Sequence, residues 1–145
     1  ERPKLITDVA NRYGSQCVIV SIDARKRSND YSVFTNCGTK DSGKEPIEWG
    51  KQSAGLGAGE IMMTSVDKDG TSLGLDLELI NNASSKISVP IIGSGGCGLS
   101  EHFVQGFDAG ASAVAAGSFF SQKDQNPMQC RSHVRNANHP IRLEV

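Results

Sequence analysis

Residues 89–98 read Val-Pro-Ile-Ile-Gly-Ser-Gly-Gly-Cys-Gly, and they give the clearest indication of how this chain folds. The first half of this stretch, Val89–Gly93, is β-branched and apolar, as in a strand covered on both faces, and a glycine-rich loop follows directly. Ser100 then predicts the N-cap of a helix that carries Phe103 and Phe107, and Gly110 predicts its end. The stretch therefore predicts one strand–loop–helix unit of an α/β protein.

The same unit recurs along the chain. The other predicted elements are a helix around Leu5–Tyr13 that Gly14 ends, a strand at 17–22, a short alternating segment at 31–35, a helix over Pro46–Leu56, a strand over Glu60–Val66, a helix over Asp76–Lys86, a strand over Ala113–Ala116 and a helical stretch that reaches Asn136. Four alternations predict βαβ units and a parallel sheet. A complete (β/α)8 TIM barrel has about 250 residues, whereas this chain has 145. We therefore expect residues 1–145 to form a single half-barrel domain that covers strands 5–8, and Glu1 in place of Met indicates a fragment.

Composition excludes several function classes. The chain has 15 Lys and Arg against 16 Asp and Glu, so it lacks the basic patch of a nucleic-acid-binding protein. Its apolar runs are far shorter than the roughly 20 residues of a membrane span. The four cysteines form no Cys-x-x-Cys pair and the three histidines are isolated, which favours reduced thiols, no metal site and no cofactor. We expect a soluble, cytoplasmic protein. For the cysteines, the alternative to plain reduced thiols is a nucleophilic role for Cys37 or Cys97.

The residues that could carry chemistry follow the predicted strands, because α/β barrels build their active sites at the carboxyl ends of the strands. These ends carry Asp23, then 64–70, then 94–98, then Gly117-Ser118. Paired glycines before a helix allow backbone N–H groups to converge on an anion. Gly95-Gly96 and Gly117-Ser118 would follow strands 7 and 8, where such barrels commonly hold a phosphate.

Each of these motifs has a plainer interpretation. The glycines could serve only as tight strand-to-helix turns. Asp23 could cap a helix, although the cations at 25–27 could lower its pKa and keep it ionised to accept a proton.

A family resemblance adds to these predictions. It rests on five stretches that occur in the family's order: Val20-Ser21-Ile22-Asp23-Ala24, Val33-Phe34-Thr35, Gly57-Ala58-Gly59-Glu60-Ile61, Thr64-Ser65-Val66-Asp67-Lys68-Asp69-Gly70-Thr71 and Ile92-Gly93-Ser94-Gly95-Gly96-Cys97-Gly98. Together they resemble the cyclase subunit of imidazole glycerol phosphate synthase, called HisF, from about Ile6 to Arg142. The resemblance implies a lyase of histidine biosynthesis, in which ammonia attacks a phosphoribulosyl-formimino aminoimidazole carboxamide ribotide to give imidazole glycerol phosphate and an aminoimidazole carboxamide ribotide.

The resemblance also implies roles for individual residues. Asp23 matches the second catalytic aspartate of the family, with a role in proton transfer. Thr64 and Ser65 match polar residues that line the mouth of the barrel. The positions that match the binding site of one substrate phosphate are Asp69, Gly70, Gly95, Gly96, Gly117 and Ser118.

The family has further parts that lie outside this chain. Its first catalytic aspartate, its other phosphate site and strands 1–4 belong to an N-terminal half, so we expect the isolated chain to be inactive. A glutaminase subunit (HisH-like) supplies the ammonia from the opposite face of the barrel. Gly93, Gly117 and Asn36-Cys37 depart from the commoner family residues, which leaves open a paralogue that supplies ammonia for amidotransfer in surface-sugar synthesis. The remaining alternative is a non-catalytic phosphate-binding half-barrel, and an isolated half is expected to self-associate.

Overall fold

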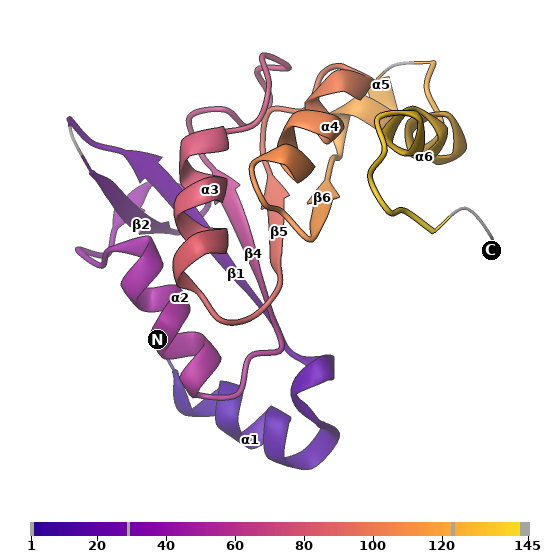
Figure 1. The fold of residues 1–145 in the computed structure, drawn as a ribbon. Helices are drawn as coiled ribbons and strands as arrows, with labels where there is room; N and C mark the ends of the chain where they lie inside the picture. Colours follow the sequence, from indigo (N-terminus) through magenta and orange to yellow (C-terminus); the bar gives the residue numbers. More distant parts are fainter. Residues whose placement is uncertain (1, 29, 123, 143–145) are drawn as a thin grey trace.

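The computed structural model describes residues 2–28, 30–122 and 124–142 and contains one six-stranded sheet in the order β3-β2-β1-β4-β5-β6 (Figure 1). Four strands run parallel, and their bounds are β1 Ile19–Lys26, β4 Glu60–Ser65, β5 Ile91–Ser94 and β6 Ala113–Ala115. The other two, β2 Tyr31–Thr35 and β3 Lys40–Asp41, form an antiparallel hairpin against β1. The predicted α/β class with a parallel sheet is confirmed, and the segment at 31–35 adds an antiparallel edge to it.

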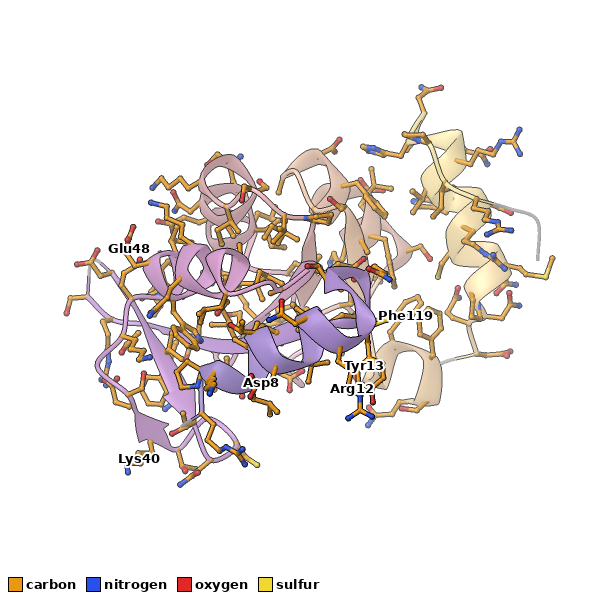
Figure 2. All side chains as sticks on the ribbon, turned by 90° about the horizontal axis from the view of Figure 1, so that it is seen from below. Asp8, Arg12, Tyr13, Lys40, Glu48 and Phe119 are labelled. Atoms are coloured by element: carbon orange, nitrogen blue, oxygen red, sulfur yellow. The ribbon has the colours of Figure 1, made fainter. Side chains whose placement is uncertain are left out.

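Helices alternate with the parallel strands, as the periodicity predicts. Their bounds are α1 Lys4–Tyr13, η1 Ser15–Cys17, α2 Pro46–Gly55, α3 Leu77–Lys86, α4 Ser100–Asp108, α5 Ser118–Gln122 and α6 Pro127–Asn136. Helices α2, α3 and α4 cover one face of the sheet (Figure 1). Helix α1 lies at the amino ends of the strands, with Asp8, Arg12 and Tyr13 projecting into solvent (Figure 2). No helix within the described ranges is both long and apolar enough to cross a membrane.

The helix termini follow the local sequence closely. The Glu45 carboxylate accepts the N–H groups of Ile47 and Glu48, with Pro46 in the first turn as predicted. Asp76 caps α3 by accepting the Leu79 N–H at 3.1 Å. Gly14 and Gly110 end α1 and α4 with positive φ angles of 90° and 98°, respectively.

The prediction that Ser100 caps α4 was wrong. Leu99 is the N-cap residue and Ser100 is the first residue of the helix. The Ser100 hydroxyl lies 3.9 Å from Cys130 Sγ. The imidazole of His102 accepts the N–H of Leu99 instead, so the capping comes from inside the helix.

Strand β1 is longer than predicted and one of its edges is covered. It continues to Lys26, which places Asp23 inside the strand and not just after it. Residues 23–26 pair with β2 on their outer edge, because the chain folds back as a hairpin immediately after β1. Among the described residues, the outer edge of β1 is therefore open only over residues 19–22.

Burial alternates cleanly along the strands. The face under the helices contributes Ile22, Ile61, Met63 and Ile91, each at most 1% exposed, to the core. The residues on the other face, such as Ile19 with 55% exposure, have no helix of the described chain above them. A second core cluster, which contains Phe119, joins α4, α5 and α6. The sheet therefore has one packed face and one open face.

Candidate functional site

Three polar side chains form a row across the open face of the sheet. Asp23 pairs in register with Thr64, and Thr64 pairs with Ser94. All three are partly exposed, whereas the residues on either side of each within its strand face the helices and are buried. Directly paired residues on neighbouring strands lie about 5 Å apart. Ser94 lay within the predicted 94–98 segment but was given no individual role, and its place as the last residue of β5, next to Gly95-Gly96, is the signal that could have identified one.

A cavity of 170 Å³ opens at this end of the sheet. It is lined by Asp23, Cys37, Gly38, Thr64, Val66 and Asp69. Three of the predicted site residues, namely Asp23, Thr64 and Asp69, therefore meet in one place, although they come from β1, from β4 and from the loop that follows β4. Typical ligand pockets measure about 300–1,000 Å³, so this cavity is smaller than such a pocket.

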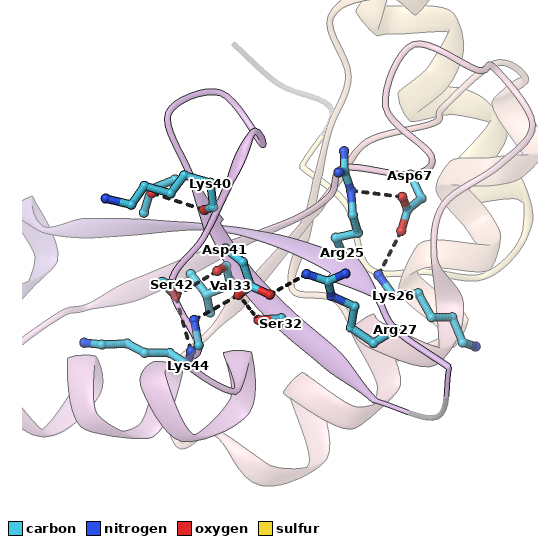
Figure 3. A network of polar contacts seen from close by, with 12 residues as sticks. Arg25, Lys26, Arg27, Ser32, Val33, Lys40, Asp41, Ser42, Lys44 and Asp67 are labelled. Carbon is cyan, nitrogen blue, oxygen red and sulfur yellow. Dashed lines mark hydrogen bonds and ion pairs between the residues drawn. The ribbon is translucent and has the colours of Figure 1, made fainter.

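The carboxylate of Asp23 has a raised pKa. Burial is the main cause, since it disfavours the ionised form, and the negative charge of Asp69 is the second. The prediction that the cations at 25–27 lower this pKa was wrong. Figure 3 shows why: Arg25 pairs with Asp67 at 3.3 Å and Arg27 pairs with Asp41, so these guanidinium groups are engaged by other carboxylates.

Ser65 does not join the cavity. Its side chain is 1% exposed on the helix-covered face, and its hydroxyl donates to Asp76 Oδ2 at 3.3 Å. Tyr31 donates to the other oxygen of the same carboxylate at 2.9 Å, and burial together with Asp76 raises the Tyr31 pKa. The expectation that the Ser65 side chain lines the mouth is therefore not met. The side chain instead belongs to a network that ties the β2 hairpin to the start of α3.

The glycine-rich loop after β5 is held tightly against the loop after β4. Gly95 and Gly96 have φ angles of 89° and 101°, which side chains rarely adopt. A Cβ on Gly95 would lie 2.7 Å from the Ser65 carbonyl oxygen and 3.5 Å from Asp69 Cβ. The Gly96 carbonyl accepts the Gly74 N–H at 2.8 Å. This loop therefore adjoins the cavity through Asp69.

Backbone donors remain available in these loops. Within the described ranges, the N–H groups of Gly70, Gly95, Gly96 and Gly117 donate no backbone hydrogen bond. Gly117 and Ser118 stand at the start of α5, just after β6. Gly117 is exposed and has open space around its Cα. The arrangement can accept an anion through backbone N–H groups at the ends of β5 and β6.

The cysteines divide into two classes. Cys97 and Cys130 are buried, and burial raises the Cys97 pKa to about 12, so that thiol stays protonated and the alternative role as a nucleophile finds no support. Cys37 is exposed and lines the cavity. Cys17 is also exposed but lies before the amino end of β1. Among the described residues there is no group of three or more His, Cys, Asp or Glu side chains that could hold a metal ion.

Comparison with known proteins agrees with this geometry. The model of the family described as "Histidine biosynthesis protein" matches residues 1–126. The chain belongs to this family. Its sheet and helices accordingly form about the second half of a (β/α)8 barrel, which confirms the predicted fold class.

Individual relatives are longer than this chain. It is 55% identical, over 98% of its own length and 55% of the relative's, to "Putative imidazole glycerol phosphate synthase subunit hisF2" of Prochlorococcus marinus (strain MIT 9313). It is 44% identical to "Imidazole glycerol phosphate synthase subunit HisF" of Bacillus cereus (strain ATCC 10987 / NRS 248), over 97% of this chain and 57% of that protein. The HisF subunit of Endomicrobium trichonymphae is 41% identical over 97% of this chain and 54% of its own length. The chain thus spans about half the length of the curated relatives it matches.

Proposed function

We propose that this chain is the phosphate-binding half of an ammonia-dependent cyclase barrel, the HisF type of imidazole glycerol phosphate synthase subunit. The reaction is the lyase and cyclase step of histidine biosynthesis, in which ammonia converts the phosphoribulosyl-formimino ribotide into imidazole glycerol phosphate and an aminoimidazole carboxamide ribotide. One observation carries the proposal: Asp23, Thr64 and Asp69 line one cavity, and Asp69 adjoins the glycine loop at Gly95.

Asp23 is the proposed proton-transfer group. Asp23 lies within β1, which pairs with β2 on one side and β4 on the other, and this pairing fixes the face of the sheet to which its side chain points. A raised pKa makes an ionised carboxylate a stronger base, because the efficiency of proton abstraction increases with basicity. Thr64 lies one strand away on the same row, and we propose that it donates a hydrogen bond to the same substrate.

One substrate phosphate is proposed to bind the backbone at the ends of β5 and β6. The donors are the N–H groups of Gly95, Gly96, Gly117 and Ser118, to which Gly70 adds a fifth. The Asp69 carboxylate would repel a phosphate, so we assign the contact at this point to the Gly70 backbone and leave the Asp69 side chain beside Asp23. Its negative charge then helps to set the basicity of Asp23.

The complete activity needs parts that this chain lacks. We propose that an N-terminal half closes the open face of the sheet and supplies the other catalytic aspartate and the second phosphate site. This chain and such a half together form the intact barrel. A glutaminase subunit, docked at the amino ends of the strands, is the proposed source of ammonia. We propose that the reaction needs no cofactor and takes place in the cytoplasm.

Turnover by the intact barrel tests the proposal. With an ammonium salt as nitrogen source, the ribotide substrate should yield imidazole glycerol phosphate, detected by chromatography and mass spectrometry. Failure to form this product, with the protein folded and substrate bound, would reject the cyclase assignment.

A second candidate is a HisF-like paralogue that supplies ammonia for amidotransfer to a surface sugar. It rests on the departures from the commoner family residues at Gly93, Gly117 and Asn36-Cys37. The same product assay separates the two, because a paralogue would release ammonia from its glutaminase partner without forming imidazole glycerol phosphate. A half-barrel that only binds phosphate would do neither.

A further inference from the structure

His102 holds the glycine-rich loop from inside helix α4. Its Nδ1 accepts the Gly98 N–H at 3.0 Å and the Leu99 N–H at 3.3 Å. The side chain is buried, with 9% exposure. In a common capping box this position, the third residue of the helix, is occupied by Glu or Gln. The imidazole of His102 therefore accepts the backbone N–H groups at the helix start, a role that a carboxylate or a carboxamide usually has.

The ring also stands where the two loops meet. Gly74, in the loop after β4, donates its N–H to the Gly96 carbonyl. A Cβ on Gly74 would lie 3.6 Å from His102 Nε2. His102 thus lies beside Gly74 and accepts hydrogen bonds from the end of the 95–99 segment, and the loops that contain these residues flank the proposed phosphate site.

Two consequences follow for an anion at that site. The Gly98 and Leu99 N–H groups point to the imidazole and are taken, so the loop presents the Gly95 and Gly96 N–H groups instead. An Nδ1 that accepts hydrogen bonds carries no proton, so the neutral ring satisfies the loop without adding negative charge. A glutamate would cap the helix equally well but would repel a phosphate close by.

We propose that His102 is a positioning residue: a neutral cap that holds the glycine-rich loop in its anion-binding conformation. The proposal rests on the proposed phosphate site and deepens it. His102 itself does not contact the phosphate. It acts by setting the shape of the loop and by adding no negative charge beside the proposed phosphate site.

The test compares His102→Gln with His102→Glu in the intact barrel. The two side chains match in size and each can accept the loop N–H groups, so they differ in charge alone. Inorganic phosphate is the probe, titrated by calorimetry at low ionic strength, and thermal unfolding is recorded for both. We expect similar unfolding midpoints, near-parental phosphate affinity for His102→Gln, and affinity about tenfold weaker for His102→Glu, with the difference shrinking as salt is added.

His102→Leu removes the acceptor. Its phosphate affinity should fall about tenfold, the scale expected when one buried and one part-buried donor lose their shared acceptor. Equal affinities of the Gln and Glu variants would overturn the neutral-cap argument, and so would parental affinity of a folded Leu variant. If the Leu variant does not fold, the Gln and Glu pair still decides. Absence of phosphate binding by the parental barrel would instead reject the proposed phosphate site itself.

Discussion

Gly117 offers the clearest perturbation of the proposed phosphate site. A Cβ at Gly117 would meet no described atom within 4 Å, and its φ lies outside the left-handed region. Gly117→Val should therefore change the free energy of unfolding by no more than about 0.5 kcal/mol, as is usual for open surface positions. Gly96 behaves differently, because its φ of 101° and its contact with Gly74 make any side chain there disruptive. A loss of binding at Gly96 would be ambiguous, whereas one at Gly117 would not.

The expected effect on binding is large. If the Gly117 N–H approaches a phosphate oxygen closely, the branched side chain blocks one charge-assisted hydrogen bond. Such bonds contribute about 1.5–3 kcal/mol, which corresponds to a loss of roughly 10- to 150-fold in affinity. Gly117→Ala, with a smaller side chain, should give an intermediate loss.

Calorimetric titration of the intact barrel with inorganic phosphate measures the effect. Gly55→Val serves as the matched control, since Gly55 also has open space around it and lies at the end of α2, away from the site. Parental phosphate affinity in folded Gly117→Val would show that no anion approaches this backbone and would remove Gly117 from the proposed site.

Four further outcomes follow from the same geometry. Burial and Asp69 raise the Asp23 pKa above 3.8, so the ionised carboxylate opposes folding once the pH exceeds that value. Asp23→Asn should therefore raise the unfolding midpoint at about pH 7 and leave it unchanged near pH 3. The opposite order would contradict the burial argument. Asp69→Asn removes one cause of the raised pKa, so the acidic limb of the kcat/KM profile should move to lower pH, while a stationary limb would exclude Asp23 as the titrating base. The bisphosphorylated substrate should slow thiol labelling of Cys37 about tenfold and leave Cys17 unaffected, as mass spectrometry of labelled peptides would show; equal rates with and without substrate would place the ligand elsewhere. The isolated chain should sediment as a dimer or larger assembly because its open face exposes residues such as Ile19, and a stable monomer at low micromolar concentration would show that this face needs no cover.

The repeating elements could be predicted from sequence because each leaves a local signal. Runs such as 60–66 are too apolar and too β-branched for a surface segment, and Gly14, Pro46 and Gly110 mark helix ends through their own backbone preferences. The convergence of Asp23, Thr64 and Asp69 was predictable as well, since the carboxyl ends of parallel strands meet at one edge.

The electrostatics of Asp23 could not be predicted in this way. The cations at 25–27 are its neighbours in sequence, but their partners come from other segments: Asp67 follows β4 and Asp41 lies on the hairpin. The group that does act on Asp23 is Asp69, more than 40 residues away. Pairing across strands decides a pKa here, and spacing along the chain does not reveal it.

The facing of Ser65 and the cap at His102 were missed for a related reason. Thr64 and Ser65 are adjacent, so in a strand they necessarily point to opposite faces. Which of them faces the cavity depends on the register with Asp23 and Ser94, which the sequence alone does not state. A histidine that accepts loop N–H groups carries no sequence signature comparable to that of a Glu or Gln in a capping box.

The steady-state rate of Asp23→Asn in the intact barrel, with ammonium as nitrogen source, decides whether Asp23 is the proton-transfer group. The amide keeps the shape of the carboxylate but cannot take a proton. We predict that kcat falls about 100-fold or more, the loss expected for a missing general base, while KM for the phosphorylated substrate stays near its parental value. Near-parental kcat would contradict the account and assign Asp23 to the framework of β1.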